Sequence, residues 1–201
     1  MRHKIPFLLI YSRFFIGTAV ILLSIQQVDN YRFIAVFLMS IGLLTDIFDG
    51  IIARKLNIST QNLRRLDSSA DLFFFLSFAL ATYLQCPDFF ENNQLKTAVL
   101  VSFEGLTYFI CFIKFRKEIA THTIGAKMWT LLLFACLSEI ILKCHSGLLF
   151  DLCFWGGILT RLEIAAIILV LKKWTNDVPT VYHACLLRHG KEIKRHKIFN
   201  G

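Results

Sequence analysis

Charged side chains are scarce in this chain. Asp, Glu, Lys and Arg make up 18% of its 201 residues, whereas 56% are hydrophobic. A soluble domain of this length could not bury so much apolar surface, which excludes a soluble globular protein. Proline is also rare, at three residues, and no Ser/Gly-rich linker or internal repeat divides the chain. We therefore expect an all-α fold, a polytopic membrane helix bundle.

Apolar runs long enough to cross a bilayer, roughly 17 to 22 residues, predict about six transmembrane helices. With loose ends they cover residues 7–25, 33–51, 70–86, 95–113, 128–142 and 149–171. The first run follows Arg2 and Lys4 like a secretory signal. However, Arg13 interrupts it and no small-x-small cleavage site follows, which favours a retained helix. We expect a transmembrane domain over residues 1–175 and a basic cytoplasmic tail over residues 176–201.

Cysteine and histidine lack the spacing of metal or redox motifs. The six cysteines include no C-x-x-C, and the six histidines include no H-E-x-x-H, so a zinc site is not expected. We interpret the cysteines as small buried hydrophobic residues. They are Cys86, Cys111, Cys136, Cys144, Cys153 and Cys185.

Basic residues are distributed unevenly between the loops that would alternate across the membrane. One side carries Arg32, Lys96 and Lys143. The other side carries Arg2, Lys4, Arg54, Lys55, Arg64, Arg65, Lys114, Arg116, Lys117, Lys127 and every basic residue from Lys172 onward. The positive-inside rule places this second side, with both termini, in the cytoplasm. The net charge of +8 thus indicates topology and attraction of the tail to anionic lipids, and no nucleic-acid partner is expected.

Four aspartates stand at the rim of two predicted helices, where an unpaired carboxylate is costly. Asp46 and Asp49 are three residues apart and share a helix face. Asp67 and Asp71 are four apart and also share one. Residues 51–66 are just long enough for a helical extension and a reversing loop that brings the two pairs together. Two divalent cations that prefer oxygen ligands, Mg²⁺ or Mn²⁺, would then relieve the repulsion between four carboxylates.

A two-metal site of this kind suits displacement at phosphorus, because the ions neutralise a diphosphate and the departing phosphate. Gly50 and Ala53 lack bulky side chains and would let a nucleotide approach the helix backbone, and Arg54 would clamp a phosphate. The alternative is that these are ordinary interfacial charges. That alternative is better for any one of them alone, but not for the whole set at this spacing.

The run D-x-x-D-G-x-x-A-R from Asp46 to Arg54, with L-x-x-x-D-x-x-x-D from Leu63 to Asp71, resembles the signature of the CDP-alcohol phosphatidyltransferase family. Chain length, helix count and motif position extend the resemblance to nearly the whole chain. It implies a membrane enzyme of phospholipid biosynthesis that moves a substituted phosphate from a CDP-linked lipid, such as CDP-diacylglycerol, to a small alcohol acceptor and releases CMP. It also implies a homodimer. We expect the protein in the inner membrane of a bacterium, with the active site on the cytoplasmic side, where the positive-inside rule places the acidic motif.

The same resemblance implies residue roles. The metal ligands would be Asp46, Asp49, Asp67 and Asp71. The nucleotide contacts would be Asp46, Gly50, Ala53 and Arg54. Asp71 would also be the general base that takes the proton of the acceptor hydroxyl. Lys127 lies in a segment similar to one of phosphoglycerol-type members, and Arg13 is near the cytoplasmic end of the first helix, so each is a candidate contact to the acceptor or a phosphate.

Two positions depart from the family pattern. Leu63 stands where the family has glycine, and its branched side chain would crowd the nucleotide. Phe103-Glu104 stands where phosphoglycerol-type members have Arg-Glu on the fourth helix. The first departure motivates an alternative function, a catalytically impaired member that serves as a lipid-binding or assembly protein. A membrane prenyltransferase is less favoured, because its two acidic motifs are widely separated in a longer chain.

Four further charges, Glu104, Glu139, Arg161 and Glu163, fall within the apolar runs. Such residues face the bundle interior or one another. We expect a structural pair between Arg161 and either Glu104 or Glu139, in preference to a role in an acceptor pocket.

Overall fold

The computed structural model describes residues 5–56, 60–117, 119, 121, 123–191 and 193. In these residues the regular structure is helical, from α1 to α8, which confirms the all-α prediction. The chain divides into two compact units. The first is drawn from Met1–Asn93 and Phe134–Gly147, and the second from Gln94–Leu133 and Leu148–Gly201, so α6 contributes to both.

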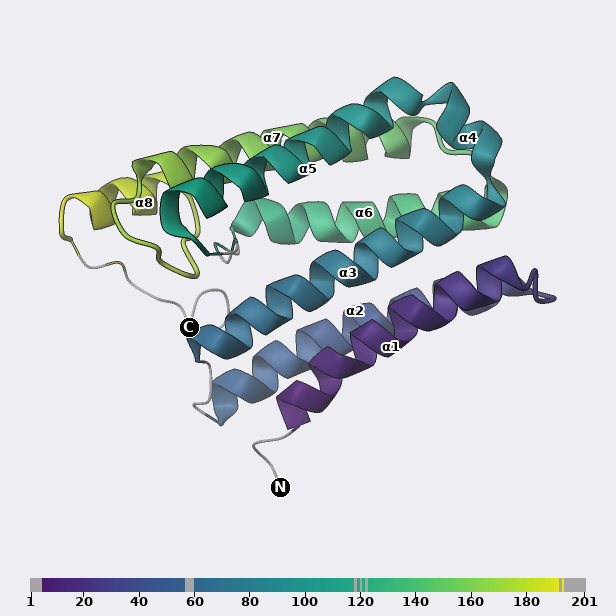
Figure 1. The fold of residues 1–201 in the computed structure, drawn as a ribbon, viewed down its shortest axis with the longest axis horizontal. Coiled ribbons are helices and arrows are strands. Elements are labelled where there is room, and N and C mark those ends of the chain that lie inside the picture. Colours follow the sequence, from purple (N-terminus) through teal and green to yellow (C-terminus); the bar gives the residue numbers. More distant parts are fainter. Residues whose placement is uncertain are drawn as a thin grey trace. The chain divides into compact units, whose positions relative to one another are not determined.

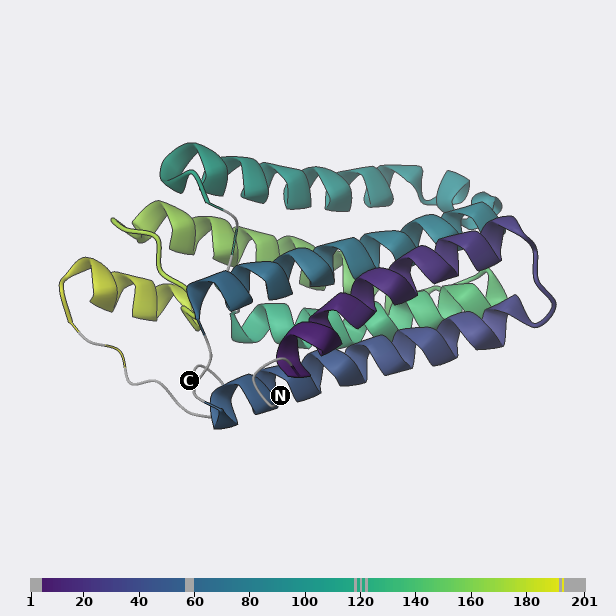
Figure 2. The same cartoon turned by 60° about the horizontal axis from the view of Figure 1, so that its bottom comes forward.

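The first unit is built on three long helices. They are α1 (Ile5–Ile25), α2 (Tyr31–Lys55) and α3 (Gln61–Gln85), followed by the short α4 (Pro87–Asn92). In Figures 1 and 2, α1 runs beside both α2 and α3. The buried residues of α1 recur every three or four positions, as one face of a helix requires. They are Pro6, Ile10, Arg13, Gly17, Val20 and Ser24.

The second unit pairs α5 (Gln94–Phe115) with α7 (Leu148–Val170), and α7 with α8 (Val181–Arg188). It also holds the first part of α6 (Ile124–Lys143). Arg161 Nε lies 2.6 Å from Glu104 Oε2, which confirms the pair predicted between α7 and α5. Glu139 instead accepts hydrogen bonds from Lys143 and Ser146.

Helices of membrane-crossing length account for most of the predicted spans. Among the described residues, five helices are long and apolar enough to cross a bilayer: α1, α2, α5, α6 and α7. The remaining predicted run, residues 70–86, falls in α3, which has 25 residues but carries charges in its first turns and is not among the five. Exposed Phe15, Phe33, Leu95 and Trp155 show that large apolar side chains cover the helices' outer surface, as lipid contact requires.

Two cysteines differ from the prediction that all six are buried hydrophobic residues. Cys86 and Cys144 form a disulfide, with Cα atoms 5.2 Å apart. Cys86 follows the last turn of α3 and Cys144 follows the last turn of α6, and these helix ends meet in the first unit. Spacing could not reveal this pair, because the residues are separated by 58 positions. The prediction is confirmed for Cys111, Cys136 and Cys153, which are buried, and is wrong for Cys185, which is partly exposed.

Gly42 allows α2 to approach α3 closely. A Cβ atom there would lie 2.3 Å from ring carbons of Phe74, whose ring is 1% exposed and packs on Phe78. We expect Gly42→Ala to lower the free energy of unfolding by about 1–3 kcal/mol, the usual cost of overpacking. Thermal unfolding in detergent measures it. The control is Gly105→Ala on α5, where a Cβ meets no atom of the described residues within 4 Å. Equal melting temperatures for both variants would contradict this packing.

Candidate functional site

The four aspartates of the sequence motif converge within the first unit. Asp46 and Asp49 lie in the last turns of α2, and Asp67 and Asp71 in the first turns of α3. Thr60 fixes where α3 begins, because its hydroxyl accepts a hydrogen bond from the Leu63 amide at 3.3 Å. The three-residue and four-residue spacings then turn each pair toward the other helix. The predicted meeting of the two pairs is therefore present in the structure.

All four carboxylates form ion pairs with Arg13 of α1. Its Nη1 lies 3.1 Å from Asp46 Oδ1 and also pairs with Asp71. Its Nη2 lies 2.5 Å from Asp49 Oδ2 and 2.6 Å from Asp67 Oδ1. The Arg13 side chain is 1% exposed. A single buried cation thus holds acids from two helices.

Three of the acids are close enough to share a small cation. One oxygen from each of Asp46, Asp49 and Asp67 lies within 4.8 Å of the others. The Asp49 side chain is 4% exposed and that of Asp67 15%, while Asp46 and Asp71 are each 33% exposed. The cluster therefore has a buried floor and a more open rim, and it presents hard oxygen donors.

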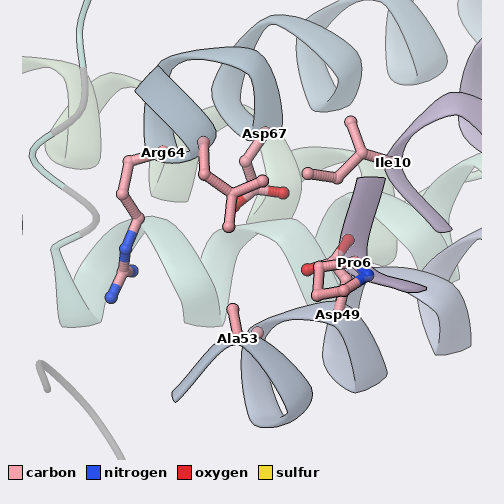
Figure 3. Close-up of a pocket in the computed structure, with 8 residues that line it drawn as sticks. Pro6, Ile10, Asp49, Ala53, Arg64 and Asp67 are labelled. Atoms are coloured by element: carbon pink, nitrogen blue, oxygen red, sulfur yellow. The ribbon is translucent and has the colours of Figure 1, made fainter. Parts of the chain in front are cut away.

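A pocket opens beside these acids (Figure 3). Asp49 from α2 and Asp67 from α3 face it, and α1 closes it with Pro6 and Ile10. Its remaining lining residues are Gly50, Ala53, Leu63 and Arg64. Gly50 and Ala53, predicted as nucleotide contacts, thus line a pocket together with two of the predicted metal ligands.

Leu63 fills part of this pocket wall. Its side chain is 3% exposed and packs with Ile10, Ala53 and Ala70 in one apolar cluster. Leu63 is therefore a core residue of the first unit as well as part of the pocket wall.

The other predicted site residues lie elsewhere or outside the described part. Arg54 belongs to α2, but its side chain is outside the described residues, as are the basic residues of the tail from Lys194 onward. Lys127 lies in the first turn of α6, in the second unit. Sequence reasoning missed that Arg13 is the common partner of all four acids. The signal was present, because Arg13 continues the buried stripe of Pro6 and Ile10 at helical spacing.

Comparison with known proteins decides the family. The family model described as CDP-alcohol phosphatidyltransferase matches residues 3–174, nearly the whole chain. The chain belongs to the CDP-alcohol phosphatidyltransferase family. The converging aspartates and the pocket lie within the matched residues, and the apolar helices are those of an integral membrane enzyme of phospholipid synthesis.

One curated relative of this phosphatidyltransferase is the CDP-diacylglycerol–glycerol-3-phosphate 3-phosphatidyltransferase of Aquifex aeolicus (strain VF5). It is 29% identical over 179 residues, which cover 86% of this chain and 93% of the relative. No solved structure matches the chain. The similarity therefore spans both compact units.

Proposed function

We propose that this phosphatidyltransferase moves the phosphatidyl group of CDP-diacylglycerol to the hydroxyl of a small alcohol and releases CMP, with Mg²⁺ or Mn²⁺ bound at the acid cluster. One observation carries the proposal: the four signature aspartates meet around the buried guanidinium of Arg13, beside a pocket. The family supplies the reaction class, a CDP-linked donor and an alcohol acceptor.

The residues present fit divalent ions. Their donors are carboxylate oxygens, and three of them lie within 4.8 Å of one another. A guanidinium among them indicates that the cluster stabilises positive charge. The proposed ligands are Asp46, Asp49, Asp67 and Asp71. When bound, the ions would neutralise the diphosphate and stabilise charge on the departing CMP.

The protein residues then have separate tasks. Asp71, on the open rim, accepts the proton of the acceptor hydroxyl as its oxygen attacks the phosphorus that carries the lipid. The new oxygen–phosphorus bond forms as the bond between that phosphorus and the bridging oxygen breaks, and CMP leaves with the electron pair. Gly50 and Ala53 leave space for the nucleotide against α2, and Arg54 contacts its phosphates.

Glycerol 3-phosphate is the first acceptor to test, because it is the acceptor in the name of the Aquifex relative. Phosphoglycerol-type members have Arg-Glu where this chain has Phe103-Glu104. Here Glu104 pairs with Arg161 of α7. This glutamate therefore also has a guanidinium beside it, but the arginine comes from a different helix. We propose that Arg13 and Lys127 are further candidate contacts to the phosphates of donor or acceptor.

Purified protein in lipid should release CMP from CDP-diacylglycerol when given Mg²⁺ or Mn²⁺ and the correct alcohol. The assay uses glycerol 3-phosphate, glycerol, serine and inositol separately, and the lipid product of each is identified by mass spectrometry. A product that contains both the diacylglycerol phosphate and the alcohol supports the proposal. Absence of CMP with every acceptor would favour the impaired-member alternative that Leu63 motivates.

We also propose that the acid cluster faces the cytoplasm, as the basic loops predict. The Cys86–Cys144 disulfide supports this orientation. At a rise of 1.5 Å per residue, Asp67 and Cys86 lie about 28 Å apart along α3, close to the hydrocarbon thickness of a bilayer. Disulfides persist in oxidising compartments, so the Cys86 end belongs on the side away from the cytoplasm.

Thiol labelling tests this orientation in intact bacterial cells that express the protein. A membrane-impermeant maleimide should modify Cys86 and Cys144 only after an impermeant phosphine has reduced the disulfide, because both lie on the outer side. A cysteine introduced by Lys55→Cys should react only after the cells are permeabilised. Peptide mass spectrometry identifies the modified sites. Modification of the residue-55 thiol in intact cells would reverse the proposed orientation.

We propose a homodimer as well, because the family resemblance implies one. Light scattering of the protein in detergent, corrected for the micelle, measures its mass. A monomer mass at the concentrations of the activity assay would refute this part of the proposal.

A further inference from the structure

Arg13 lies at the centre of the acid cluster, and each of its terminal nitrogens joins the two acidic helices. Nη1 pairs with Asp46 of α2 and Asp71 of α3. Nη2 pairs with Asp49 of α2 and Asp67 of α3. We infer that Arg13 and the divalent cations are alternative counter-ions of these carboxylates: the guanidinium holds the cluster together without metal and leaves it when metal binds. This inference rests on the proposed metal site.

The Arg13 guanidinium and a metal ion need the same space. Nη2 bridges Asp49 Oδ2 at 2.5 Å and Asp67 Oδ1 at 2.6 Å. A Mg²⁺ ion binds carboxylate oxygens at about 2.0–2.1 Å, so an ion that bridges these two oxygens would occupy the position of Nη2. The same holds for Nη1 between Asp46 and Asp71. A guanidinium cannot stay between these oxygens while ions bind them.

The charge of the cluster also favours exchange of Arg13 for metal. The guanidinium contributes one positive charge to four carboxylates, which leaves the metal-free cluster negative. Two divalent ions contribute four charges and neutralise the carboxylates without Arg13. Keeping Arg13 among the same oxygens would add an excess positive charge in a largely buried site, where unbalanced charge is costly. Exchange is therefore favoured over addition.

The Arg13 side chain can move more easily than the α1 backbone that carries it. One turn beyond Arg13, a Cβ at Gly17 would lie 2.9 Å from Phe73 Cε1 and from Ser77 Oγ, so the α1 backbone is packed tightly on α3. A shift of the helix is thus disfavoured. Among the described residues the buried Arg13 Nε atom has no hydrogen-bond partner, so the contacts that hold the guanidinium there are those of its terminal nitrogens. Rotation about the side-chain bonds can release it, and a bound diphosphate would be a suitable new acceptor.

The test is Mn²⁺ binding to purified wild-type protein and Arg13→Gln in detergent, measured from the spectrum of free Mn²⁺ by electron paramagnetic resonance. Removal of the competing cation should lower the Mn²⁺ Kd at least about tenfold. In EDTA, Arg13→Gln should melt at a lower temperature than wild type, because its carboxylates lack a counter-ion, and saturating Mn²⁺ should remove that difference. A residue that merely supports the fold would not tighten metal binding.

Arg32→Gln is the matched control, since Arg32 donates to the Leu142 carbonyl, outside the cluster, and its loss should leave the Mn²⁺ Kd unchanged. Arg13→Lys keeps the positive charge but has one terminal nitrogen, and it should bind Mn²⁺ with an affinity between those of wild type and Arg13→Gln. If Arg13→Gln does not fold, the Mn²⁺ Kd of Arg13→Lys is compared with that of wild type instead. Equal or weaker Mn²⁺ binding by the folded Arg13 variants would overturn the inference. Absence of Mn²⁺ binding in every protein, wild type included, would refute the metal site itself.

Discussion

Asp71→Asn is expected to lower CMP release by about 10²–10⁴-fold, the usual contribution of a general base. Asparagine keeps the size of the side chain but cannot take the proton of the acceptor hydroxyl. Asp71 is 33% exposed on the rim of the cluster, whereas Asp49 on its floor is 4% exposed, so Asp71 is better placed to meet an incoming alcohol. The rate of CMP release at saturating donor and acceptor measures the effect.

The control for this variant is Asp151→Asn. Asp151 is a half-exposed aspartate in the first turn of α7, in the second unit, and pairs with Lys96. Its loss should leave CMP release within about twofold of wild type, as a surface ion pair contributes little to stability. Undiminished release by Asp71→Asn would remove Asp71 from the proposed mechanism.

Leu63→Gly is expected to destabilise the first unit strongly without creating the enzyme's activity. The substitution removes a side chain that is 3% exposed and packs on Ile10, Ala53 and Ala70. Large-to-small changes in a core cost about 2–5 kcal/mol, so a clear fall in melting temperature is expected. Wild type should already release CMP, because the pocket wall is packed around Leu63, the residue that stands in place of the family's glycine.

Leu95→Gly is the matched control for stability. Leu95 also lies near the start of a long helix, but it is 76% exposed. Its replacement should therefore leave melting nearly unchanged in detergent. The decisive comparison is CMP release at a temperature where Leu63→Gly is folded. If wild type releases no CMP and Leu63→Gly does, the impaired-member alternative is established.

The helices and the meeting of the acids could be predicted from local rules. Apolar runs of bilayer length identify spans, and spacings of three and four place Asp46 with Asp49 and Asp67 with Asp71 on common faces. Only a short connection separates the two pairs. The convergence therefore needed no knowledge of distant contacts.

Features that depend on how distant helices pack were not predictable in this way. Arg13 is 33 residues from Asp46 and 58 from Asp71, and its position depends on the register of α1 against both α2 and α3. The Cys86–Cys144 pair likewise depends on which helix ends meet. The core role of Leu63 follows from the approach of Ile10 on α1. Each needs a tertiary contact that spacing does not contain.

The most direct test of the central claim is the metal dependence of CMP release by wild-type protein in lipid. With CDP-diacylglycerol and glycerol 3-phosphate or another accepted alcohol, release should stop in EDTA and return when Mg²⁺ or Mn²⁺ is added in excess. CMP release that continues unchanged in EDTA would contradict the account.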